Sequence, residues 1–164
     1  MNDTILQERR RSIARRHQQI GWLGLLVFLC LGIALESLHG FKIGWYLDPA
    51  SRLRRLLWTL AHAHGTLLAL VHIAFSMSLL HFGRWKGRSL QLASFFLTDA
   101  LIFLPLGFLL GGIGHTEVDP SPGIFLVPLG AAFLLASIAM IATASLRQEN
   151  ASDAHPGPSS PAER

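Results

Sequence analysis

The chain has 164 residues, of which 51% are hydrophobic and only 15% are charged, and its formal net charge is +4. Soluble domains carry about 25% charged residues, so this composition excludes a disordered chain and argues against a soluble enzyme. The single cysteine, Cys30, excludes a disulfide framework or a cysteine-based zinc site within one chain. In a membrane protein such positive charge reports topology, so we expect no nucleic-acid partner.

Four runs of apolar residues are each long enough to cross a bilayer, which takes about 20 residues of helix. They cover residues 20–38, 56–80, 90–112 and 123–146. The first run is longer than the apolar region of a signal peptide, so we interpret it as an uncleaved anchor. The sequence therefore predicts an all-α protein, an integral membrane four-helix bundle within 20–146. A basic arm (1–19) precedes the bundle, and a polar tail (147–164), predicted to be disordered, follows it.

The positions of lysine and arginine predict how the bundle is oriented. If both termini share one side, ten of the 14 lysine and arginine residues lie on that side. The positive-inside rule then places the N- and C-termini in the cytoplasm, with the bundle in a bacterial inner membrane. The four basic residues of the first loop, within 42–55, run against this orientation.

Ionisable side chains inside a membrane are costly, so each one is a functional hypothesis. The second span carries His62 and His64 in its outer half. The first span ends on the same side with Glu36 and His39, which share one helix face at a spacing of three. His115 follows the outer end of the third span. At a rise of 1.5 Å per residue these five residues lie at similar depth, so we predict that they form one site on the outer side.

Imidazole and carboxylate groups together suit Zn, Fe, Cu or Mn. The predicted site therefore binds a metal ion, a haem or a small ligand, and a hydrogen-bonded polar cluster without metal is the alternative. Two other functions stay open. One is a small membrane enzyme that uses Glu36 and the histidines as acid–base groups, and the other is a structural or assembly subunit of a membrane complex. The small residues of the fourth span also permit a homo-oligomer, and in every case the lipid bilayer is a partner.

A stripe of small and polar residues at heptad spacing lies on the second span. Its members are His62, Gly65, Ala69, His72 and Ser76. We predict that this face points inward, so that His64 faces either another helix or lipid. The simpler interpretation is that His64 forms an interhelical hydrogen bond. Asp99 on the third span lies at the depth of His72 and is predicted to pair with it, as polar glue between helices or as a proton relay. His17 is expected near the inner surface, with no special role.

Local signals also predict how the helices begin and pack. Asp48 followed by Pro49 is typical of a helix start, which makes the second helix longer than a bilayer requires. The aromatic segment before it, 40–47, is predicted to cover the outer site. Gly107 and Gly111 permit close approach of another helix.

Two stretches resemble small bacterial four-span membrane proteins of uncharacterised function. They are Phe41-Lys42-Ile43-Gly44-Trp45-Tyr46-Leu47-Asp48 and Trp58-Thr59-Leu60-Ala61-His62-Ala63-His64-Gly65. The resemblance implies a four-helix membrane protein and brings no activity with it. The span count and the Ala61-His62 pair are also similar to the hydroxylaminobenzene mutase type, from which no activity is carried over.

Overall fold

The computed structural model describes residues 2–81, 87–114, 116 and 118–153. Every regular element in these ranges is a helix, and no strand occurs among them, so the predicted all-α class is confirmed. The elements are α1 (Asn2–Gly40), α2 (Gly44–Leu47), the 3₁₀-helix η1 (Pro49–Ser51), α3 (Arg52–His81), α4 (Arg88–Gly111), the 3₁₀-helix η2 (Pro122–Phe125) and α5 (Leu126–Asp153). The predicted start of the second helix at Pro49 is also confirmed, because η1 runs directly into α3.

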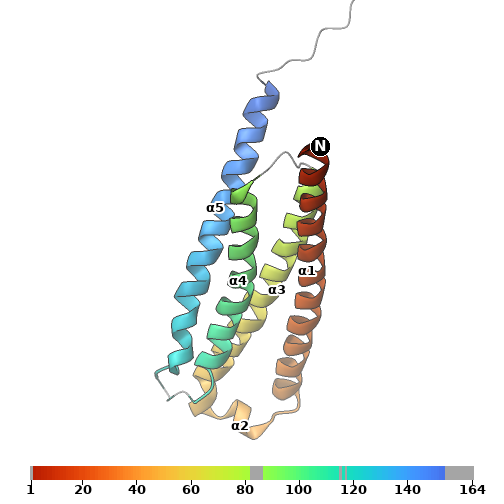
Figure 1. Ribbon diagram of the computed structural model, residues 1–164. Coiled ribbons are helices and arrows are strands. Elements are labelled where there is room, and N and C mark those ends of the chain that lie inside the picture. Colours follow the sequence, from red (N-terminus) through yellow and green to blue (C-terminus); the bar gives the residue numbers. More distant parts are fainter. Residues whose placement is uncertain (1, 82–86, 115, 117, 154–164) are drawn as a thin grey trace, which may run out of the picture.

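The four long helices form an antiparallel row in chain order (Figure 1). In length and apolar composition α1, α3, α4 and α5 can each cross a membrane, as expected of a multi-pass membrane protein. The chain neighbours α1 and α3, α3 and α4, and α4 and α5 pack against one another, and the beginning of α1 lies at the same end as the end of α5 (Figure 1). The outer two helices bury only 11% of their most apolar window, against 39% for α3 and α4. Therefore α1 and α5 offer most of the surface that lipid covers.

Small residues set the spacing between α1 and α3. The predicted inward stripe of the second span is confirmed, since Gly65, Ala69, His72 and Ser76 are buried and His62 is half-buried. A Cβ atom added at Gly24 of α1 would lie 3.1 Å from Cβ of Ala69. Two turns further along α3, Ser76 donates a 2.7 Å hydrogen bond to the carbonyl of Ala14. Close backbones and hydroxyl-to-carbonyl bonds are how membrane helices associate without a hydrophobic driving force.

The contact between α4 and α5 uses the same principle. A Cβ atom at Gly130 would lie 2.6 Å from the backbone nitrogen of Leu104, and one at Gly107 would lie 2.8 Å from that of Val127. Buried Ser137 donates a 2.9 Å bond to the carbonyl of Ala93. The predicted close approach at Gly107 is therefore confirmed.

The ends of the bundle differ from the sequence prediction in one respect. The helix α5 continues to Asp153, so the predicted disorder of the tail is wrong for 147–153. This stretch contains Arg147, Gln148 and Glu149, which are good helix formers, and proline first appears at Pro156. The remainder of the tail, 154–164, lies outside the described residues.

Candidate functional site

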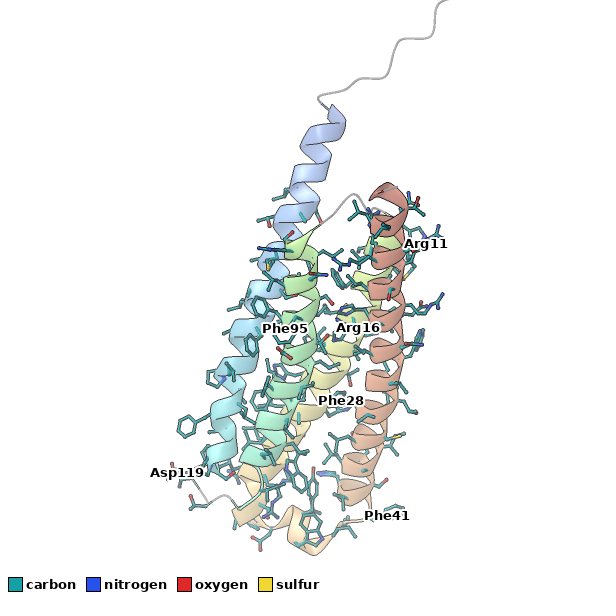
Figure 2. All side chains as sticks on the ribbon, in the orientation of Figure 1. Arg11, Arg16, Phe28, Phe41, Phe95 and Asp119 are labelled. Atoms are coloured by element: carbon teal, nitrogen blue, oxygen red, sulfur yellow. The ribbon has the colours of Figure 1, made fainter. Side chains whose placement is uncertain are left out.

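An open groove lies between the end of α1 and the first half of α3, at the end of the bundle farthest from the N-terminus. Its volume is about 910 Å³, and Glu36, His39 and His62 all line it. Apolar side chains of α1 form much of the wall, and Phe41 and Tyr46 come from the segment after α1. Figure 2 shows Phe41 at this end of α1. Three of the five predicted outer residues thus share one groove, together with the aromatic segment that was predicted to cover it.

The imidazole of His62 is held in one orientation by α1. Its Nδ1 atom lies 2.7 Å from the carbonyl oxygen of Phe28. A carbonyl oxygen only accepts, so Nδ1 carries the proton and Nε2 of the neutral ring keeps a free lone pair. A Cβ atom at Gly32 would lie 2.5 Å from Cε1 of His62, so only glycine leaves room for the ring. A histidine fixed through Nδ1 by a carbonyl is the arrangement found in metal-ligating and acid–base histidines.

The predicted site residue His64 does not line this groove. The Nδ1 atom of His64 lies 2.9 Å from the carbonyl of Leu60 in its own helix, so the predicted interhelical hydrogen bond is wrong. Its ring instead packs against Phe108 of α4, with centroids 5.0 Å apart. Residues two apart on a helix point about 200° from each other, which separates His64 from His62. His115 lies outside the described residues.

The residues that the structure describes do not form a metal-binding site. Within those ranges no group of three or more His, Cys, Asp or Glu side chains is placed to hold one. Glu36, His39 and His62 line the same groove without forming such a group. The predicted metal or haem site at these positions stays a prediction.

Tyr46 adds a hydroxyl group to the groove. Its side chain is buried, and it lines the groove beside the three polar residues. Burial raises the pKa of the Tyr46 phenol, while the positive charge of Arg55 opposes this shift and the negative charge of Glu36 adds to it. The phenol therefore remains a neutral hydrogen-bond donor at physiological pH.

Two arginines in the first turn of α3, Arg54 and Arg55, hold the aromatic segment against this helix. The Arg54 guanidinium lies over the rings of Trp45 and Trp58, 5.6 and 5.8 Å from their centroids, within cation–π range. The Nη1 atom of Arg55 donates to the carbonyls of Tyr46 at 2.5 Å and Asp48 at 2.9 Å. The positive charges of Arg54 and Arg55 therefore stabilise the aromatic segment, which gives a structural reason for basic residues at this end of the bundle.

A second polar cluster, built on the buried side chains of His17, His72 and Ser94, lies near the other end of the bundle. Nδ1 of His17 on α1 lies 2.7 Å from Nδ1 of His72 on α3, and both side chains are 0% exposed. Nε2 of His17 lies 2.7 Å from Oγ of Ser94 on α4, and Arg16 donates to the same oxygen at 2.7 Å. The cluster therefore joins three helices.

The predicted pair of His72 and Asp99 is wrong. His72 belongs to the stripe that faces α1, and its partner there is His17. Asp99 is partly exposed on α4, and the described residues give it no hydrogen bond or ion pair with His72. The prediction rested on the equal depth of the two residues in the membrane. In the structure, the side chain of His72 points to α1 and not to α4, which carries Asp99.

The sequence carried a signal for His17 that depth counting missed. Positions 14, 17, 21, 24 and 28 alternate in spacings of three and four and hold Ala14, His17, Gly21, Gly24 and Phe28. Such spacing marks one face of a helix, and it matches the stripe on α3. His17 appeared to lie outside the membrane because the apolar run begins only at Ile20, yet α1 is one helix from Asn2.

The hydrogen bonds of this cluster can be arranged in two ways. Arg16 can only donate, so Oγ of Ser94 accepts from it. If the Ser94 hydroxyl donates to Nε2 of His17, then His17 donates from Nδ1 to Nδ1 of His72; if Oγ of Ser94 also accepts from Nε2 of His17, then His72 donates to His17 instead. Both arrangements use every one of these bonds, and in both the Nε2 atom of His72 is buried without a partner in the described part of the chain. Such a chain can fix the junction of three helices and can hold or pass a proton.

Comparison of the chain with protein-family models, with curated proteins and with solved structures finds no match. The resemblance to small bacterial four-span proteins therefore stays a prediction. The chemistry of the groove and of the buried cluster carries the functional assignment.

Proposed function

We propose that this multi-pass membrane protein binds a small amphipathic molecule in the groove between α1 and α3. The observation that carries the proposal is the orientation of His62. Its Nδ1 atom is engaged by the carbonyl of Phe28, and its Nε2 atom has no partner among the described residues. An imidazole nitrogen kept free in this way accepts a hydrogen bond from a ligand or coordinates a metal ion.

The walls of the groove define the chemistry of the ligand. Glu36 favours a positive charge or hydrogen-bond donors, and His62 favours a donor. Tyr46 offers a hydroxyl group, and Leu29, Ile33 and Leu35 offer apolar contact. The ligand class is therefore a molecule with an apolar body and a head that carries O–H or N–H groups. If that molecule is a substrate, His62 is the residue placed to act as a general base.

The removal of one ring tests the proposal. We expect small molecules released from the full-length protein, purified from its native membrane, to include one compound at near-stoichiometric amount. Its occupancy falls about fivefold or more in His62→Ala, because a ligand donor left without its acceptor costs about 1–3 kcal/mol. The matched variant His64→Ala retains it, because His64 is bonded within its own helix. The readout is mass spectrometry of the released compounds beside elemental analysis.

Two outcomes would contradict the proposal. One is a stoichiometric metal ion, lost in His62→Ala, in place of an organic compound, which would make the groove a metal site. The other is no compound in the wild-type protein, or equal occupancy in both variants. A variant counts only if its unfolding midpoint in detergent matches that of the wild type.

We also propose that both termini are cytoplasmic in a bacterial inner membrane, so that the groove opens outward. The excess of basic residues at the terminal side supports this orientation. Arg54 and Arg55 lie at the other end, against the rule. Their charges contact aromatic rings and carbonyl groups there, so a structural role accounts for their position.

Surface labelling in intact cells tests the orientation. In a Cys30→Ser background we expect a membrane-impermeant maleimide to label Val118→Cys and to leave Gln7→Cys unlabelled. Both positions are exposed. Gln7 is one turn before Arg11 and Val118 directly precedes Asp119, and Figure 2 shows Arg11 and Asp119 at opposite ends of the bundle. Labelling of Gln7→Cys, with or without Val118→Cys, contradicts the orientation; lysed cells provide the positive control.

A further inference from the structure

A second groove lies between α1 and α4, at the end of the bundle that holds the N-terminus. Its volume is about 910 Å³, and its charged lining consists of Arg9, Arg16, Arg88 and Glu8. We propose that this groove binds an anionic phospholipid of the surrounding leaflet, with the phosphate at the arginines. This site is separate from the histidine groove at the other end and does not depend on the function proposed for it.

The charge of the groove favours a phosphate group. The lining contains three arginines and one glutamate, so its net charge is positive. All three arginine side chains are exposed. Arg16 is fixed by its 2.7 Å bond to buried Ser94, and a guanidinium has further N–H donors to offer. Arg88 is the first residue of α4, where the positive end of the helix dipole adds to the attraction.

The apolar lining distinguishes a lipid from a free anion. Ile13 of α1 and Leu92 and Phe95 of α4 continue the groove beside the arginines. The two helices run in the same direction from this end of the bundle (Figure 1). These apolar residues therefore lie further from the N-terminal end than Arg9 on α1 and Arg88 on α4. Figure 2 shows Arg16 and Phe95 at about the same level of the bundle. Phosphate and acyl chain therefore find their contacts within one groove.

The depth of the groove also suits a lipid. Side chains on a helix tilt toward its N-terminus, and both helices have their N-termini at this end (Figure 1). Arg88, at the start of α4, therefore reaches toward the headgroup layer, while Arg16 is held deeper in the groove by Ser94.

Lipid binding to the full-length protein in detergent tests the proposal. The probes are phosphatidylglycerol, phosphatidylcholine with the same acyl chains, and inorganic phosphate, and native mass spectrometry reads the bound lipid. We expect phosphatidylglycerol to bind in preference to phosphatidylcholine. The double variant Arg9→Gln/Arg88→Gln weakens its binding roughly twenty-fivefold, since each arginine that contacts the phosphate contributes about a factor of five.

A matched double variant separates the groove from general charge. Arg11→Gln/Arg15→Gln removes the same charge from the same end of the protein, and both residues are exposed on α1 outside this groove. Figure 2 labels Arg11 on that helix. We expect it to reduce phosphatidylglycerol binding less than threefold.

Three results would overturn the proposal: equal loss in the two double variants, equal binding of the two lipids, or displacement of phosphatidylglycerol by equimolar inorganic phosphate. The last result would identify a site for free anions. Arg16 is left unchanged in both variants because its bond to Ser94 belongs to the buried cluster.

Discussion

Leucine in place of either His17 or His72 is expected to lower the free energy of unfolding by about 1–3 kcal/mol, and the double replacement by less than the sum. Each single change leaves a ring nitrogen of the other histidine buried without its 2.7 Å partner, and an unpaired buried polar group costs about that much. The double change removes both polar groups and keeps similar volume, while Ser94 retains Arg16. The measurement is the midpoint of unfolding in detergent for the four proteins of a double-mutant cycle.

The expected coupling energy between the two histidines is about 1–2 kcal/mol. Hydrogen bonds between membrane helices average about 0.6 kcal/mol and reach about 1.7, and this one is short and joins two fully buried side chains. His64→Leu is the control, because His64 bonds within its own helix and is half-buried. Additive single effects, or a control as costly as His72→Leu, would show that the pair does not join α1 to α3.

Gly130→Ala is expected to cost about 2–3 kcal/mol, although alanine is the better helix former. The added Cβ atom would lie 2.6 Å from the backbone nitrogen and 2.9 Å from the Cα atom of Leu104. Backbone atoms cannot rotate away as a side chain can, so α4 and α5 must separate and lose contact along their length. The unfolding midpoint in detergent measures the effect.

Gly40→Ala provides the matched control. Gly40 is also helical, and a Cβ atom there meets nothing within 4 Å. We expect stability equal to the wild type or higher by up to about 1 kcal/mol, because alanine loses less backbone entropy than glycine in a helix. If the two variants behave alike, close approach at Gly130 does not set the spacing of α4 and α5.

Some of the candidate site was predictable from sequence because depth can be counted. The length of each apolar run placed Glu36, His39 and His62 at one end of the bundle, and these residues line one groove. The same counting placed His64 and Asp99 with the wrong neighbours. Depth constrains position along the membrane normal, whereas contact also requires that two helix faces turn toward each other.

The sequence by itself determined the all-α class, the four spans and the inward face of α3, because apolar length and heptad spacing are properties of one segment at a time. Only the tertiary structure decided that His72 meets His17, that the carbonyl of Phe28 orients His62, and that Arg54 fastens the aromatic segment. Each of these depends on which helix lies opposite and at what rotation. That choice comes from many small contacts between helices distant in the chain, such as the one at Gly24.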